Sequence, residues 1–192
     1  MAVNPMPFLS LFLPLFGAAM LALLPSPAWA DQTDVRLDGL FDLLATSSGR
    51  PAAQAAEAEI WRIWVASGRE EIDALMAEGL VAMNDQRFEA AIDLFGQITR
   101  RAPEFAEGWN KRATAYYLND DHVASVRDIQ TTLALEPRHF GAISGMGLIF
   151  LRRGDEEGAL AAFEAVLAIH PGAPGARQRV EELRKRLGER GA

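Results

Sequence analysis

The sequence contains no cysteine, so the protein has neither disulfides, nor a thiol nucleophile, nor a lipidated N-terminal cysteine. It has only three histidines, His122, His139 and His170, and no spacing places two metal ligands on one helical face. We therefore expect no metal, no cofactor and no catalytic residue. With 19 Lys and Arg against 26 Asp and Glu, the formal charge is -7. That balance argues against nucleic acid as a partner, because phosphate binding requires an excess of cationic side chains.

Charged side chains are also missing from the first thirty residues, where the run from Phe8 to Leu24 is nearly all apolar. Small residues at Ala28 and Ala30 resemble a signal-peptidase site. We therefore predict a signal peptide over residues 1–30, cleavage between Ala30 and Asp31, and a periplasmic protein of a Gram-negative bacterium. The alternative is an uncleaved leader that anchors the chain in the inner membrane, facing the periplasm, because the run is near the shortest length that spans a bilayer.

Prolines recur every 34 residues, at Pro103, Pro137 and Pro171, and each ends a helical unit because proline cannot continue the preceding helix. The units cover residues 72–105, 106–139 and 140–173. Small residues recur in the first helix of each unit, at Gly79, Ala113 and Gly147. The second helix of each unit begins with a small residue, at Ala91, Ser125 and Ala159, and a large apolar residue follows four positions later, at Phe95, Ile129 and Phe163. Small residues let helix axes approach while large ones fill the space between them. The pattern predicts stacked helix pairs that bury a continuous core.

Two further segments flank these units. The pattern of residues 31–71 predicts an N-terminal helical pair, which is either a degenerate repeat or a cap. It departs from the repeat at Glu57, where a small residue is expected. The alternative is an unrelated helical extension. Residues 174–192 predict a C-terminal capping helix with apolar residues at helical spacing between Arg and Glu.

The central unit, with Trp109, Ala113, Tyr116, Tyr117 and Pro137 in these places, resembles a tetratricopeptide repeat, and the other two units resemble the same pattern. The resemblance implies an all-α solenoid, a right-handed superhelix of antiparallel helix pairs, with Trp109 buried between helices. The chain departs from the family at Glu78 and Arg112, which stand where Leu is usual and imply more open packing.

In this family the first helices line an inner groove that commonly takes a peptide. Carried over by register, and supplemented by nearby polar residues, the resemblance implies a markedly apolar peptide-binding groove formed by Met76, Leu80, Met83, Asn84, Asn110, Thr114, Tyr117, Ser144, Leu148, Leu151 and Arg152. Such a surface suits an apolar or amphipathic segment. Alternatively, these residues contact the next unit. The paired Lys and Asn that clamp a peptide carboxylate in one sub-family are not matched here.

The resulting expectation is a non-catalytic protein-interaction scaffold or adaptor of the cell envelope with a protein or peptide partner. A membrane-anchored structural module that self-associates is the alternative, and the sequence does not indicate an oligomeric state. A remote third hypothesis is that the protein is an enzyme. It requires a pocket that gathers His122 or His139 with a carboxylate from a different unit.

Overall fold

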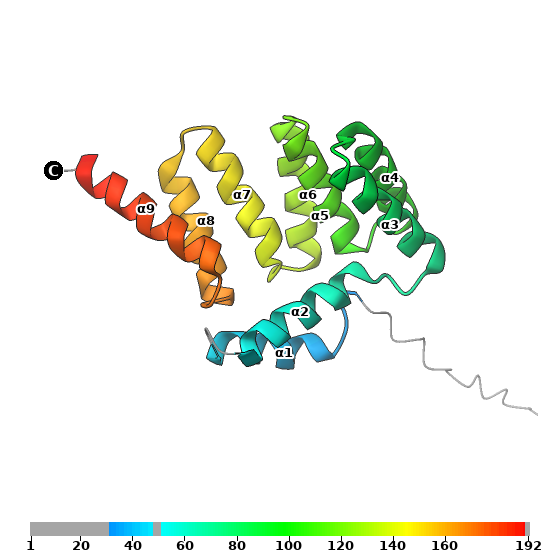
Figure 1. Cartoon of the computed structure of the whole chain (residues 1–192), viewed down its shortest axis with the longest axis horizontal. Helices are drawn as coiled ribbons and strands as arrows, with labels where there is room; N and C mark the ends of the chain where they lie inside the picture. Colours follow the sequence, from blue (N-terminus) through cyan, green and yellow to red (C-terminus); the bar gives the residue numbers. More distant parts are fainter. Residues whose placement is uncertain (1–30, 48–50, 191–192) are drawn as a thin grey trace, which may run out of the picture.

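The computed structural model describes residues 31–47 and 51–190, and the proposed leader, residues 1–30, lies outside them. This part of the chain contains nine helices and no strand (Figure 1). Their bounds are α1 Arg36–Thr46, α2 Pro51–Val65, α3 Glu70–Asn84, α4 Phe88–Arg101, α5 Ala106–Leu118, α6 His122–Leu135, α7 Phe140–Arg152, α8 Glu156–Ile169 and α9 Pro174–Arg190. The expected all-α stack of helix pairs is confirmed: α3–α4, α5–α6 and α7–α8 are the three repeating units.

The turn inside each unit has the same local structure. Gln86, Asp120 and Gly154 occupy equivalent places and all have positive φ, of 59°, 64° and 72°. Glycine adopts this left-handed conformation without steric cost, whereas Gln86 and Asp120 adopt it against the usual preference. In the second and third units the next helix is then capped by an aspartate, because Asp121 accepts from Ala124 N at 3.0 Å and Asp155 from Gly158 N at 2.8 Å.

Small residues allow the two helices of a unit to touch, as the sequence pattern predicts. A Cβ atom added at Gly79 would lie 2.3 Å from Cε1 of Phe95, and one added at Gly147 would lie 2.9 Å from Cζ of Phe163. Both phenylalanines are buried. The glycines are therefore required by the close approach of each ring to the facing helix backbone.

The expectation that Trp109 is buried between helices is wrong, since its side chain is only half-buried. Trp109 is not among the buried residues of α5, which are Ala106, Glu107, Gly108, Asn110, Ala113 and Ala115. The indole Nε1–H donates to the carbonyl oxygen of Pro103 at 2.9 Å, and the guanidinium of Arg112 lies 4.8 Å from the ring centroid.

A charged residue at position 112 implied more open packing between the helices, but Arg112 does not hold the helices of its unit apart. Its Nε and NH2 groups donate to the two carboxylate oxygens of Asp128 at 2.6 and 2.8 Å, so the pair bridges α5 and α6 in a bidentate geometry. A further donor reaches Thr99 Oγ1 in α4 at 2.8 Å. The arginine therefore links three helices.

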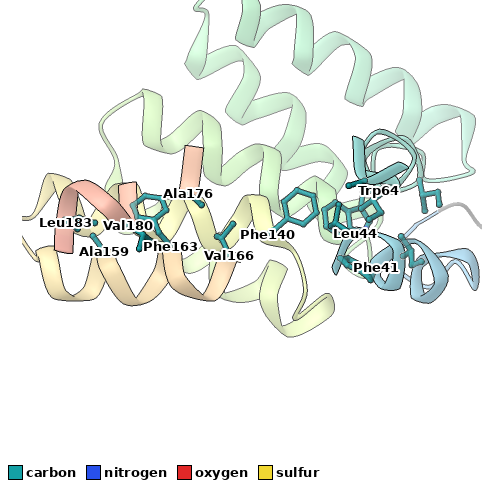
Figure 2. Close-up of a cluster of buried hydrophobic side chains, with 14 residues drawn as sticks. Phe41, Leu44, Trp64, Phe140, Ala159, Phe163, Val166, Ala176, Val180 and Leu183 are labelled. Carbon is teal, nitrogen blue, oxygen red and sulfur yellow. The ribbon is translucent and has the colours of Figure 1, made fainter. Parts of the chain in front are cut away.

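The α1–α2 pair lies along the edge of the stack where the units are joined (Figure 1). Its main contacts with other helices are to α5 and α8, so it does not continue the stack at the α3 end. Each turn that follows a repeat unit receives a contact from the pair or its lead-in. Gln32 donates to the carbonyl oxygen of Glu104 at 2.5 Å, Asp38 pairs with Arg138 at 2.7 Å, and a Glu57 carboxylate oxygen lies 3.2 Å from Nε2 of His170. Figure 2 shows Phe41, Leu44 and Trp64 beside Phe140, the first residue of α7.

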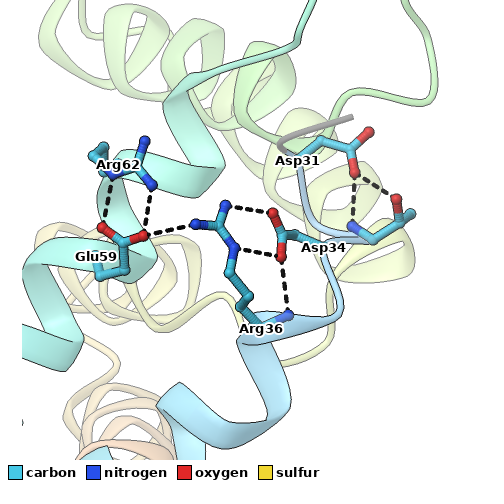
Figure 3. Close-up of polar contacts among 6 residues, drawn as sticks. Asp31, Asp34, Arg36, Glu59 and Arg62 are labelled. Atoms are coloured by element: carbon cyan, nitrogen blue, oxygen red, sulfur yellow. Dashed lines mark hydrogen bonds and ion pairs between the residues drawn. The ribbon is translucent and has the colours of Figure 1, made fainter. Parts of the chain in front are cut away.

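A chain of ion pairs near the surface includes one, between Arg36 and Glu59, that joins α1 to α2 (Figure 3). Arg36 contacts Asp34 at 2.6 Å and Glu59 at 3.0 Å, and Glu59 also pairs with Arg62 at 2.5 Å. The hydrogen bond from Arg36 is the main cause that lowers the pKa of Asp34. Solvent-exposed pairs of this kind contribute little stability, so the apolar contacts carry most of the cohesion between the two helices.

The C-terminal helix α9 packs on α8 through Ala176, Val180 and Leu183, and its other face is exposed (Figure 2). Ion pairs from Arg184 to Glu164, at 2.7 Å, and from Arg186 to Glu156, at 3.2 Å, tie the exposed face to α8. One apolar cluster thus runs from α1 and α2 through α7 and α8 to α9. Among residues 31–47 and 51–190, no helix has the length and apolar character needed to cross a membrane.

Candidate functional site

A hollow of about 220 Å³ opens between α5 and α7, with α6 at its base. It exists because α7 begins with small residues that leave space beside α5. Five of the residues predicted for the peptide-binding groove line it, three from α5 and two from α7. They are Asn110, Thr114, Tyr117, Ser144 and Leu148, and the remaining wall is formed by Ala113, Ser125, Ile129, Gly141, Ala142 and Gly145. We call this space the α5–α7 pocket.

The polar groups of the α5–α7 pocket are partly engaged by the protein itself. Ser125 Oγ donates to Ala113 O at 2.8 Å, and Thr114 Oγ1 donates to Asn110 O at 2.9 Å. The Asn110 side chain is buried and donates from Nδ2 to Glu107 at 2.9 Å. The pocket therefore offers mainly apolar surface, edged by groups that retain acceptor capacity.

The other predicted groove residues are not gathered in that pocket. Met76 and Leu80 line a separate hollow of about 580 Å³ between α2 and α3, and Arg152 lines a third hollow between α6 and α7. Met83 packs against the core of the first unit and Leu151 against the cluster that reaches α9, while Asn84 is exposed. The predicted residues thus do not form one continuous groove.

Trp61 of α2, which the sequence did not place at the site, lies between the α5–α7 pocket and the hollow between α2 and α3. It lines the hollow between α2 and α3, and its Cη2 would lie 2.6 Å from a Cβ atom added at Gly141, which lines the α5–α7 pocket. Lys111 Nζ lies 5.4 Å from its ring centroid. Two tryptophans close together in α2, Trp61 and Trp64, were the signal in the sequence. The residues that they contact could not be predicted from spacing within the helix.

A buried polar cluster lies next to the α5–α7 pocket, where α2 meets α5 and α7. The carboxylate of Glu107 contacts Lys111 Nζ at 2.9 Å and His139 Nε2 at 2.8 Å, and both Glu107 and His139 are essentially inaccessible to solvent. His139 Nδ1 accepts from Ala142 N at 3.1 Å, so Nε2 carries the proton and donates to Glu107. The ring of Trp64 stacks on His139 with centroids 4.1 Å apart.

The environment of Glu107 acts on its pKa in two directions. Burial raises the pKa, whereas the charge of Lys111 and the hydrogen bond from His139 lower it, and the net result is a pKa of about 2. The carboxylate is therefore ionised throughout the physiological range. Its charge is balanced by Lys111 and stabilised by the hydrogen bond from His139, while the carboxylate itself is inaccessible to solvent.

This cluster holds the fold together and has no open position for a substrate. His139 caps the first turn of α7 and reaches Glu107 of its own unit, beneath the ring of Trp64. Within residues 31–47 and 51–190, no three His, Asp or Glu side chains are arranged to hold a metal ion.

Comparison with known proteins agrees with this architecture. The sequence model of the family described as Tetratricopeptide repeat matches residues 76–129 and 124–174. The chain belongs to the tetratricopeptide repeat family. A TPR repeat-containing protein of Rhizobium etli is 34% identical over 191 aligned residues, with 93% of each chain covered.

Two solved structures have the same fold. The Sgt2 TPR domain from Aspergillus fumigatus matches with a TM-score of 0.59 and 26% identity, covering 64% of this chain and 83% of that domain. The first TPR of Spaghetti (RPAP3), solved bound to an HSP90 peptide, matches with a TM-score of 0.59 and 20% identity, covering 62% and 94%. Tetratricopeptide repeats are protein-interaction scaffolds and are typically non-catalytic.

Proposed function

We propose that this TPR protein is a non-catalytic adaptor of the cell envelope that binds an apolar or amphipathic segment of a partner protein. The observation that carries the proposal is the α5–α7 pocket, an apolar hollow of about 220 Å³ on the first helices of two adjacent units. A space of this size suits one or two side chains rather than a whole small-molecule ligand. The TPR of Spaghetti (RPAP3), which has this fold, was solved with a peptide bound.

The pocket walls fit an apolar anchor with a polar backbone beside it. Leu148 and the ring of Tyr117 supply apolar contacts, and the hydroxyls of Thr114 and Ser144 lie at the same pocket. An extended or helical segment that places one Leu, Met or Phe in the pocket leaves its backbone near those hydroxyls. Burial of that anchor supplies most of the binding free energy, and the hydroxyl contacts fix the orientation.

Thr114→Trp is expected to abolish partner binding, because the exposed Thr114 side chain lines the pocket and an indole there would fill it. The measurement is photo-crosslinking from a benzoylphenylalanine placed at Ser144, with the crosslinked segment identified by mass spectrometry. We expect the crosslinked segments to be apolar or amphipathic. Thr114→Trp should then lower the affinity for the identified segment by about tenfold or more. Gln130→Trp, on the exposed face of α6, is the control that retains binding. Equal crosslinking by Thr114→Trp, or crosslinks to purely polar segments, would contradict the proposal.

The envelope location rests on the apolar run and the Ala28–Ala30 exit of the leader. We expect the protein isolated from the periplasmic fraction to begin at Asp31. Mass spectrometry of the N-terminal peptide measures this directly. A chain that retains Met1 to Ala30 in the membrane fraction would instead support the anchored, self-associating module.

A further inference from the structure

A larger hollow, of about 740 Å³, lies at the opposite end of α7 from the α1–α2 pair, between the start of α6 and the end of α7. Three apolar and three cationic side chains form most of its wall: Val123, Val126, Ile149, Arg127, Arg152 and Arg153. Val123 is 65% exposed although it is apolar. We call this space the arginine hollow.

The three guanidinium groups of the arginine hollow are not balanced by ion pairs with the described residues. Arg127, Arg152 and Arg153 are exposed, and none forms an ion pair with a described residue. Arg152 makes one side-chain hydrogen bond, from Nε to the hydroxyl of Tyr117 at 3.4 Å. Arg152 is thus held by Tyr117, whereas no described residue forms an ion pair or a hydrogen bond with the side chain of Arg127 or Arg153. Such a cluster of guanidinium groups is unexpected in a chain whose formal charge is -7.

The remaining polar groups of the wall offset only part of this positive charge, because the negative charge of Asp120 acts on Arg152. Among the described residues, Asp120 is the only carboxylate that lines the hollow, and it lies 3.7 Å from Nδ1 of His122. The other ring nitrogen of His122, Nε2, is buried and has no hydrogen-bond partner among the described residues. The wall therefore has one carboxylate against three guanidinium groups and an unsatisfied imidazole nitrogen.

The repeats themselves indicate that this composition is specific to one junction. At the equivalent junction between α4 and α5, Glu89 and Asp93 stand in place of Val123 and Arg127. Leu118 and Asn119 likewise replace Arg152 and Arg153 there. The same backbone scaffold thus carries two carboxylates at one junction and three arginines at the next, so repeat packing alone does not require the arginines.

We propose that the arginine hollow binds an acidic amphipathic segment of a partner protein. Apolar side chains of that segment pack on Val123, Val126 and Ile149, and its carboxylates accept hydrogen bonds from the surrounding guanidinium groups. Guanidinium and carboxylate groups match in bidentate geometry, and the apolar floor partly desolvates the pair, which strengthens it. The arginine hollow and the α5–α7 pocket share no lining residue, and they meet where Arg152 donates to Tyr117.

The experiment measures fluorescence anisotropy with three peptides of equal length: repeated Glu-Glu-Leu, repeated Ser-Ser-Leu and polyglutamate. The chain from Asp31 to Ala192 is used with all three. We expect the Glu-Glu-Leu peptide to bind tightest, with an affinity that falls as salt is raised. Arg127→Glu combined with Arg153→Glu is expected to weaken that binding by about tenfold or more. The control, Arg87→Glu with Arg179→Glu, makes the same charge change elsewhere on the surface and leaves binding unchanged.

Thr114→Trp distinguishes this proposal from the function proposed for the α5–α7 pocket, since it should leave Glu-Glu-Leu binding intact. Equal binding of polyglutamate, or equal weakening by the control pair, would reduce the effect to overall charge and overturn the proposal. If the Ser-Ser-Leu peptide bound as tightly as the Glu-Glu-Leu peptide, the arginines would not contribute to binding, and the proposal would be wrong. Arginine-dependent binding of anionic phospholipid vesicles without binding of any peptide would assign the hollow to a lipid surface instead.

Discussion

Trp64→Ala is expected to lower the free energy of unfolding by about 3–5 kcal/mol, the usual loss for a buried large aromatic side chain. Trp64 is 1% exposed. It stacks on His139 at 4.1 Å between ring centroids, and the rings of Phe140 and Trp61 lie at 5.1 and 5.3 Å. Urea denaturation followed by circular dichroism measures the loss. The truncated site cannot collapse easily, because α1, α2 and the start of α7 all contribute to its walls.

Trp109→Ala is the matched control, since it removes the same side chain from a half-buried position. We expect a clearly smaller loss of stability, because mainly one hydrogen bond to Pro103 and the Arg112 contact disappear. A separate early transition in Trp64→Ala would mean that the α1–α2 pair detaches while the repeats stay folded. Equal losses for the two variants would show that the contacts of Trp64 with α7 do not contribute as described.

Glu107→Gln is expected to lower the free energy of unfolding at pH 7 by about 3 kcal/mol, from a folded-state pKa near 2 against an ordinary value of 4.5. Because the folded-state pKa is depressed, the stability from this carboxylate is fully present above about pH 4.5. It is lost as the pH falls from 4.5 toward 2. The difference between wild type and Glu107→Gln should therefore shrink in that window. Urea unfolding of both proteins at pH 7 and pH 3 measures this change.

The loss of stability in Glu107→Gln is large because the substitution leaves the positive charge of Lys111 without a counter-charge. The glutamine amide still accepts a hydrogen bond from His139, but it no longer balances the charge of Lys111, whose side chain is 21% exposed. Glu104→Gln is the control: this exposed carboxylate lies 3.8 Å from Arg69, and its loss should cost less than about 1 kcal/mol. A pH-independent difference between wild type and Glu107→Gln would indicate that packing, rather than charge, sets the contribution of this position.

The candidate site was predictable only in part. Register within the repeats led directly to the residues of α5 and α7, because those helices repeat the same pattern and therefore face the same inner surface. The hollow between α2 and α3 and the contact of Trp61 with Gly141 were not predictable, since they depend on where α2 lies. The arginine hollow was missed for a related reason. It forms where the start of α6 faces the end of α7, and only the folded stack shows which side chains meet there.

The sequence by itself determined the three helix pairs and their stacking, because these depend on contacts within a unit or between neighbours. Proline spacing ends the units, and the facing glycine and phenylalanine positions set the approach of their helices. Only the tertiary structure decided the position of the α1–α2 pair, through contacts such as Asp38 with Arg138, which are 100 residues apart in sequence. It also decided that Trp109 lies at the side of α5 while Glu107 is buried. Local periodicity cannot specify such contacts, because each needs two surfaces that only the folded chain brings together.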